Sequence, residues 1–257
     1  AFRARTAEPL WQKKTPAVPL TLAADEHRAY YHQGDRIEAL DLETGQLLYK
    51  TEPVPITKDF MMSFFGPVLV VHEGVIVFAG GEKLNQAWMG YGRPDQGEDT
   101  MTAFAAESGK KLCTAPHPYG VYQSPEDVLI ADGLVWTAST TQGGAKGTWY
   151  GRNLRTGEVE KEIPPTLSTR WFHHRCYRAK ATDRFLLPSR NGIEFIDIAQ
   201  KQWGINHWVR SACLYGVMPA NGLLYVAPHS CACHPQAKLC GFNALAAPGE
   251  TREVPEA

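Results

Sequence analysis

Four of the six cysteines lie in one region of the last third of the chain, and their spacing suggests chemistry. They are Cys176, Cys213, Cys231 and Cys233, on segments that we expect to be neighbouring strands. Two disulfides are the simplest interpretation, with Cys213–Cys231 and Cys176–Cys233 as the preferred pairs. Closing loops of this length stabilises a fold by roughly 3 kcal/mol each. Disulfides also imply an oxidising compartment, so the cluster favours a periplasmic or extracellular protein.

A metal site is the alternative interpretation of the same cysteines. Thiolates and imidazoles are ligands for zinc or copper. A Cys-x-Cys pair on a strand places both thiols on one face, which suits a metal as well as a disulfide. The candidate ligands are Cys231, Cys233, His234 and His229, with His173 or His174 from an earlier segment. Covalent haem is disfavoured because it needs Cys-x-x-Cys-His, whereas this chain has Cys-x-Cys-His. The two remaining cysteines, Cys113 and Cys240, are expected to be free or core thiols.

A dense group of cationic side chains precedes and surrounds the first of these cysteines. The predicted ligand-binding residues are His173, His174, Arg175, Arg178, Lys180 and Arg190. Such cations would suit a carboxylate, a sugar acid or an anionic cofactor. On a strand, alternate residues face opposite ways, so these side chains cannot all enter one pocket. One set is therefore expected to be solvated or paired with nearby carboxylates. If the protein is catalytic, His173 or His174 is the candidate base.

A repeated hairpin is the element that must position these residues. Its first copy is 37–49, a strand, a tight turn at Thr44-Gly45 and a second strand. Glycine supplies the positive φ that such turns need. The other copies are 101–113, 150–160, 192–203, where the turn glycine is lost, and 240–245, the start of a fifth. Intervals of roughly 40 to 60 residues with short strands indicate propeller blades. We therefore predict an all-β propeller of about five four-stranded blades.

The repeat resembles that of the quinoprotein-like β-propeller family, the PQQ-like repeat, whose blades end in Ala-x-Asp-x-x-Thr-Gly-x-x-x-Trp. Trp203 is taken to keep the final Trp, and Tyr49 and Cys113 stand in its place in two other copies. The C-terminal block is similar to a subgroup of secreted or periplasmic-type propellers whose activity is mostly unassigned. The stretches that carry this similarity are 173–178, 192–195, 215–219, 221–225 and 231–238. The resemblance implies a ring of more blades, commonly eight. Either five blades close alone, or the chain is part of a larger seven- or eight-bladed ring.

Composition sets the remaining expectations. We predict that residues 1–17 form an entry segment or an edge strand before the first blade and that residues 18–257 form the propeller domain. The net charge of −1 offers no basic field for nucleic acid. No apolar run is long enough to span a membrane. The chain starts at Ala1, which fits a processed or trimmed protein.

A ligand-binding or scaffold module with its site at one mouth of the propeller channel is the leading functional hypothesis. Expected partners are a small molecule or carbohydrate, a further propeller segment or another protein. The alternative is an oxidoreductase that uses PQQ with calcium, or copper, although no carboxylate cluster suited to calcium is evident. A carbohydrate-active enzyme is weaker. Its stacking residues would be Trp88, Tyr91 and Trp149, but its carboxylates, Glu126 and Asp127, are adjacent and would point apart on a strand.

Overall fold

The regular elements are all strands in the part of the chain that the structure describes. The structure is a computed structural model, and it describes residues 1–56, 67–80, 99–117, 128–138, 147–166, 177–188, 193–206, 209, 211, 216–228, 239 and 241–247. The strands form five antiparallel sheets, four of which have four strands and the last three. The prediction of an all-β chain with five blades is confirmed.

Each sheet is a meander, in which consecutive strands pair in order. The first sheet contains β1 (Ala23–Ala24), β2 (Arg28–His32), β3 (Ile37–Asp41) and β4 (Leu47–Lys50). The second contains β5 (Val68–His72), β6 (Val75–Ala79), β7 (Asp99–Ala105) and β8 (Lys111–His117). The third contains β9 (Leu129–Ala131), β10 (Leu134–Ala138), β11 (Trp149–Asn153) and β12 (Val159–Ile163).

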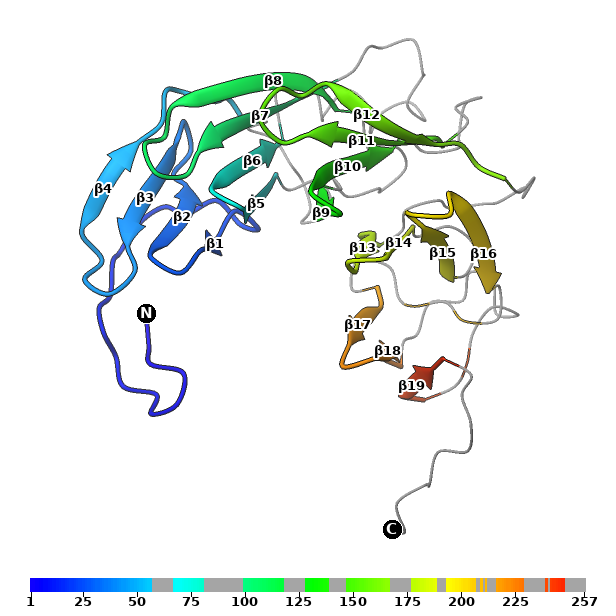
Figure 1. Ribbon diagram of the computed structural model, residues 1–257. Coiled ribbons are helices and arrows are strands. Elements are labelled where there is room, and N and C mark those ends of the chain that lie inside the picture. Colours follow the sequence, from blue (N-terminus) through cyan, green and yellow to red (C-terminus); the bar gives the residue numbers. More distant parts are fainter. Residues whose placement is uncertain are drawn as a thin grey trace, which may run out of the picture.

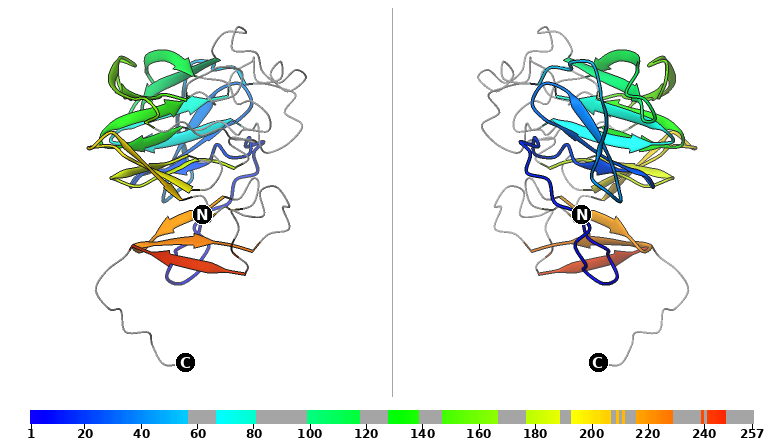
Figure 2. Two further views of the ribbon diagram at one scale, coloured as in Figure 1. Left: turned by 90° about the vertical axis from the view of Figure 1, so that its right-hand side faces the viewer. Right: turned by 90° about the vertical axis from the view of Figure 1, so that its left-hand side faces the viewer.

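The last two sheets follow the same plan. The fourth contains β13 (Lys180–Ala181), β14 (Phe185–Leu187), β15 (Ile193–Asp197) and β16 (Gln202–Asn206). The fifth contains β17 (Met218–Ala220), β18 (Leu223–Val226) and β19 (Asn243–Ala246). Figures 1 and 2 show the five sheets following one another along an arc, with the first strand of each toward its hollow. Within the described residues, the first and fifth sheets do not meet across the opening of this arc (Figure 1).

Each of the first four blades packs one face against the next blade. We call the face on this side of a blade its leading face and the opposite one its trailing face. Tyr30, on the leading face of β2, shares a buried cluster with Phe78 of the second sheet. Val77 is buried in the same way with Val135 of the third sheet. Trp136 of β10 is buried together with residues of the fourth sheet, and a smaller cluster joins the fourth and fifth sheets. The core is therefore a row of four separate clusters between blades.

The outer hairpin of the first blade has the predicted turn. Gly45 has a φ of +72°, its N–H donates to the carbonyl of Asp41 at 2.9 Å, and the Asp41 N–H donates to the carbonyl of Gln46 at 2.8 Å. Where the fourth blade lacks this glycine, Lys201 takes the left-handed conformation, with a φ of +54°. Trp203 follows Lys201 by two residues, so it does not occupy the place of the repeat's final Trp. In the first blade, Tyr49 follows the turn glycine by four residues. The expectation that Trp203 keeps the final Trp of the repeat is therefore wrong.

Candidate functional site

A cleft of about 580 Å³ lies between the fourth and fifth blades. Its lining is mostly apolar. The lining residues are Thr182, Phe185, Leu187, Phe195, Asn206, Pro219, Ala220, Asn221, Gly222, Leu223, Leu224, Leu245, Ala246 and Ala247. The volume lies within the range of small-molecule sites, roughly 300 to 1,000 Å³. This cleft is therefore the candidate binding site of the described chain.

Paired strands of the fourth blade build one wall of the cleft. The rings of Phe185 and Phe195 meet edge to face, with centroids 5.8 Å apart. Phe185 begins β14 and Phe195 lies in β15, and both point to the leading side because side chains alternate along a strand. Leu187 lies two residues beyond Phe185 and continues this wall.

The hairpin from β17 to β18 supplies the facing wall. Asn221 and Gly222 form its turn with φ values of +52° and +71°. Two consecutive positive φ angles make a tight two-residue turn, and Asn-Gly is the pair that adopts it most readily. This turn places Leu224 and, across the sheet, Leu245 toward the fourth blade, where both join the apolar cluster.

Asn206, at the end of β16, is the polar residue in the cleft with an unmet bonding capacity. Its Oδ1 is buried and accepts no hydrogen bond from the residues that the structure describes. A buried acceptor left without a donor costs about 1–3 kcal/mol. A ligand that carries an O–H or N–H group could remove this cost. Asn206 was not recognisable as a site residue from sequence, because a single Asn at a strand end is common.

One of the predicted cationic residues, Lys180, lies on a strand beside the cleft wall. Lys180 pairs across the sheet with Leu187, which lines the cleft, and cross-strand partners share a face. Arg178 precedes it by two residues and is half-buried. Both have interaction partners in the structure. His173, His174, Arg175 and Arg190 lie outside the described residues, so the full cationic site stays a prediction.

The cysteine cluster also lies outside the described part of the chain. This holds for Cys176, Cys213, Cys231, Cys233, His229, His234 and Cys240. The disulfide and metal interpretations therefore both stay predictions. Cys113 is described as a free, half-buried thiol, as expected, and burial raises its pKa. Within the described ranges, no group of three or more His, Cys, Asp or Glu side chains is placed to hold a metal ion.

Of the residues proposed for carbohydrate chemistry, Trp149 is the one that the structure describes. Trp149 is 2% exposed and belongs to the core between the third and fourth blades. The expectation that it stacks on a sugar is therefore wrong. Trp88, Tyr91, Glu126 and Asp127 lie outside the described residues.

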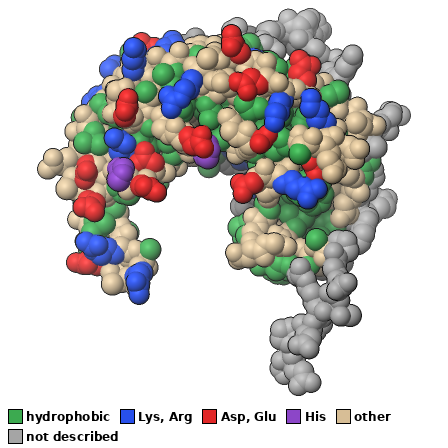
Figure 3. All heavy atoms as spheres, viewed as in Figure 1, with side chains coloured by type: hydrophobic (Ala, Val, Ile, Leu, Met, Phe, Trp, Pro, Cys, Tyr) green, Lys and Arg blue, Asp and Glu red, His purple; other side chains and the backbone are tan. Residues whose placement is uncertain are grey.

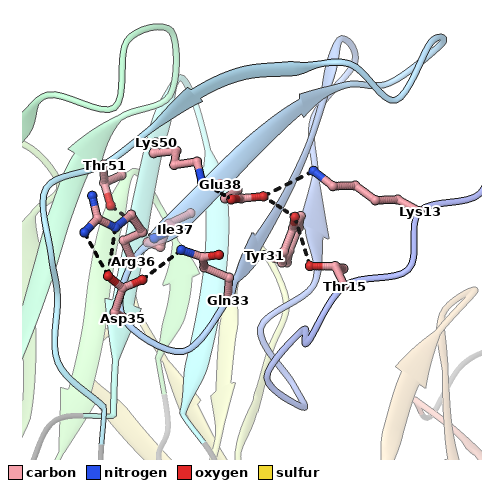
Figure 4. A network of polar contacts seen from close by, with 10 residues as sticks. All are labelled: Lys13, Thr15, Tyr31, Gln33, Asp35, Arg36, Ile37, Glu38, Lys50 and Thr51. Carbon is pink, nitrogen blue, oxygen red and sulfur yellow. Dashed lines mark hydrogen bonds and ion pairs between the residues drawn. The ribbon is translucent and has the colours of Figure 1, made fainter.

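A network of polar side chains lies on the trailing face of the first blade (Figure 4). The Glu38 carboxylate forms ion pairs with Lys13 at 3.2 Å and with Lys50 at 2.8 Å. It also accepts a hydrogen bond from the Tyr31 hydroxyl, which Thr15 contacts in turn at 3.3 Å. Burial would raise the pKa of Glu38, but the hydrogen bonds from Lys50, Tyr31 and Lys13 outweigh it and lower that pKa. Because Lys13 and Thr15 precede β1, this network fastens the N-terminal segment to the blade.

Charges on the outer side of the arc are mixed. Figure 3 shows acidic and basic side chains interspersed along it, with no large field of one sign. This agrees with the net charge of −1. The described residues contain no helix long and apolar enough to cross a membrane.

Comparison with solved structures finds other proteins of similar fold. No family model matches the chain, and no curated protein matches it. BamB from Moraxella catarrhalis aligns over 86% of this chain with 15% identity and a TM-score of 0.51. KlHsv2 with loop 6CD replaced by a Gly-Ser linker aligns over 88% with 11% identity and a TM-score of 0.52. Hsv2 from Kluyvelomyces marxianus aligns over 88% with 12% identity and a TM-score of 0.51.

These likenesses bear on the fold alone, because all identities are low. The chain spans 61% of the BamB chain and 67% of each Hsv2 chain. The propeller arrangement predicted from the repeated hairpins is thus confirmed. The likeness to BamB agrees, at the level of the fold, with the resemblance to quinoprotein-like propellers.

Proposed function

We propose that this chain is a ligand-binding module of the β-propeller class. Its ligand is a mostly apolar small molecule with at least one O–H or N–H group, held between the fourth and fifth blades. The observation that supports this most directly is the apolar cleft of about 580 Å³. Filling it with an apolar ligand removes hydrocarbon surface from water, which favours binding by roughly 25 cal/mol per Å².

Asn206 gives the proposed site its specificity. Its Oδ1 is a buried acceptor without a donor among the described residues. A ligand N–H or O–H would satisfy this atom once the Asn206 amide turns toward the cleft, whereas a pure hydrocarbon would leave it unpaired. The site should therefore discriminate between ligands that are equal in size but differ in this one group.

The predicted cations extend the same proposal. Lys180 shares a face of the fourth blade with cleft-lining Leu187. An anionic group on the ligand would lie toward Lys180 and Arg178, with His173, His174, Arg175 and Arg190 as the further predicted contributors. A long-range attraction of this kind supports binding even where the cations already have protein partners.

The proposed site of action is the periplasm or the space outside the cell. This part of the proposal is supported by the four clustered cysteines, for which we propose the pairs Cys213–Cys231 and Cys176–Cys233. A thiol count on the denatured, unreduced protein, together with metal analysis, tests it. Two free thiols, from Cys113 and Cys240, with no bound metal are expected. Six free thiols or a stoichiometric zinc or copper ion would contradict the disulfide proposal.

Fluorescence of 1-anilinonaphthalene-8-sulfonate tests the cleft, because this probe combines apolar rings, one N–H group and an anionic group. Leu245→Trp places a larger side chain in the cleft and should weaken probe binding at least tenfold. Ala244→Trp lies on the opposite face of the same strand and outside the cleft lining, so it should bind as wild type does. Asn206→Leu should weaken binding about fivefold, through loss of one hydrogen bond. Equal binding by wild type and Leu245→Trp would refute the proposal.

A further inference from the structure

The first eleven residues repeat the outer hairpin of a blade. The Ala7 N–H donates to the carbonyl of Arg3 at 2.8 Å, and the Arg3 N–H donates to the carbonyl of Glu8 at 2.9 Å. The turn at 41–46 is closed by the same two bonds, at 2.9 and 2.8 Å. Ala7 has a φ of +56°, in the left-handed region where the first blade has its turn glycine. Non-glycine residues rarely adopt this conformation, so the match in backbone is specific.

The strand register agrees as well. Phe2 and Pro9 form an antiparallel bridge. Phe2 lies five residues before Ala7, and Pro9 lies two residues after it. In the first blade the corresponding pair, Leu40 and Leu47, is bridged in the same way around Gly45. The same offsets recur in the second blade, between Phe104 and Lys111, and in the third, between Arg152 and Val159.

Trp11 packs against the first blade in the same way that a residue on the outer strand of one blade packs against the next blade. A Cβ added at Gly45 would lie 2.5 Å from Cδ2 of Trp11, so the indole lies directly against this glycine. Tyr49 lies in the same way against Gly109 of the second blade, where an added Cβ would be 2.6 Å from its ring. Trp11 follows Ala7 by four residues, as Tyr49 follows Gly45. Residues 1–11 therefore occupy the place of a blade that precedes the first one.

This hairpin corresponds to only the two outer strands of a blade. The complete blades run from an inner strand at the hollow of the arc to an outer strand at its rim. Among the described residues, Phe2 pairs with Pro9 alone, so its other edge has no strand beside it. Phe2 is 71% exposed. An unpaired strand edge is a template for another strand.

The opposite end of the arc is also unfinished. Leu134 and Trp136, the first and third residues of β10, are buried against the fourth blade. The corresponding residues of the fifth blade are Leu223 and Tyr225 of β18, and they lie on a leading face with no blade beyond it in the described chain. Beside them, Met218 is 60% exposed and Phe242 is 66% exposed. The rings of Tyr225 and Phe242 lie 6.1 Å apart, so these apolar groups form one patch.

We propose that one propeller-forming polypeptide outside residues 1–257 completes the arc. It supplies inner strands that pair with the hairpin at 1–11, and it packs a blade on the leading face of the fifth blade. The first blade cannot pack on the leading face of the fifth, because its own trailing face already carries Trp11 and the Lys13–Glu38 pair. A second copy of the chain cannot do so either, because the trailing face of its first blade is covered in the same way. Figure 3 shows the space between the two ends as an open hollow.

Site-specific photo-crosslinking in an extract of the source cells tests this proposal. The full chain carries para-benzoylphenylalanine at Phe2 or at Phe242, and crosslinked peptides are identified by mass spectrometry. Both positions should crosslink to the same polypeptide, within segments that carry the Thr-Gly hairpin repeat. Leu47, which is 46% exposed on the rim strand β4, is the matched control position and should give at least tenfold less product.

Several results would overturn the proposal. These are crosslinks to another copy of this chain, to lipid, or to two unrelated polypeptides, and yields no higher than at Leu47. Unchanged melting temperatures for the three labelled proteins would show that each is folded. The cleft between the fourth and fifth blades plays no part in this experiment, so a failure of ligand binding leaves the proposal intact.

Discussion

The imidazole of His32 lies nearly parallel to the ring of Phe78, with centroids 4.8 Å apart, and so joins the first blade to the second. Its Nε2–H donates to the carbonyl of Val54 at 2.9 Å, and its Nδ1 accepts the N–H of Gly34 at 3.0 Å. These two bonds require the neutral ring, since a protonated Nδ1 could not accept. Burial lowers the pKa of His32 more than the Val54 bond and the Asp35 charge raise it.

This arrangement predicts a pH-dependent stability. The unfolded chain protonates His32 below about pH 6.5, whereas the folded chain resists protonation until a lower pH. The free energy of unfolding should therefore fall as the pH decreases from 7 toward 5. His32→Gln should flatten this slope and cost about 1–2 kcal/mol at pH 7. Urea titrations across this range measure both, and His27→Gln, at an exposed position, should keep the wild-type slope. A slope unaltered by His32→Gln would refute the assignment.

Glu38 should add a second pH dependence to the stability of the first blade, at lower pH than that of His32. Its pKa is lowered from 4.5, so its contribution is present above that value and is lost as the pH falls through the folded pKa. Glu38→Gln should cost about 1–3 kcal/mol at pH 7, because two lysines lose their buried partner. The difference from wild type should shrink below about pH 4. Thermal unfolding at several pH values measures it, with exposed Glu43→Gln as the neutral control.

Two strand glycines should respond differently to an added methyl group. A Cβ at Gly151 would lie 2.8 Å from Cη2 of buried Trp136, whereas the nearest atom to a Cβ at Gly204 is a backbone oxygen 3.7 Å away. Gly151→Ala should therefore cost about 1–3 kcal/mol through overpacking. Gly204→Ala should change stability by no more than about 0.5 kcal/mol. Chemical denaturation of both variants checks this, and equal losses would contradict the packing described here.

The turn at Ala7 offers a stabilising substitution. Ala7→Gly should raise the free energy of unfolding by about 0.5–1 kcal/mol, because glycine adopts a φ of +56° without strain. Ala4→Gly lies in the same turn, where φ is not positive, and should be neutral or destabilising. Thermal unfolding compares the two. A loss of stability in Ala7→Gly would mean that residues 1–11 do not hold the hairpin conformation.

The repeated hairpins made the architecture predictable from sequence. Gly45, Gly109 and Gly157 mark turns that the structure confirms, with φ values of +72°, +72° and +76°. The hairpin at 1–11 escaped notice because Ala7 stands where a glycine was expected. Thr6 and Trp11, at the correct distances from it, were the remaining signals. We therefore expected an entry segment or an edge strand there.

The candidate site was less predictable. The sequence pointed to charged and sulfur-bearing side chains, of which Lys180 lies beside the cleft wall. The cleft itself arises from how far two sheets stand apart, and single-sequence periodicity carries no measure of that distance. Whether Phe185 and Leu187 face a neighbouring blade or an empty volume depends on tertiary packing.

Because the apolar core is divided among four clusters, each sheet depends mainly on its immediate neighbours. The stability of such an arrangement is approximately a sum of contributions from neighbouring sheets, as in stacked repeat proteins. Sheets in the middle are held from two sides, whereas the one that ends in β19 is held from one. Amide protons should accordingly exchange fastest in β17 to β19 and slowest in β6 and β10, so that the molecule frays from its tip instead of melting as one unit.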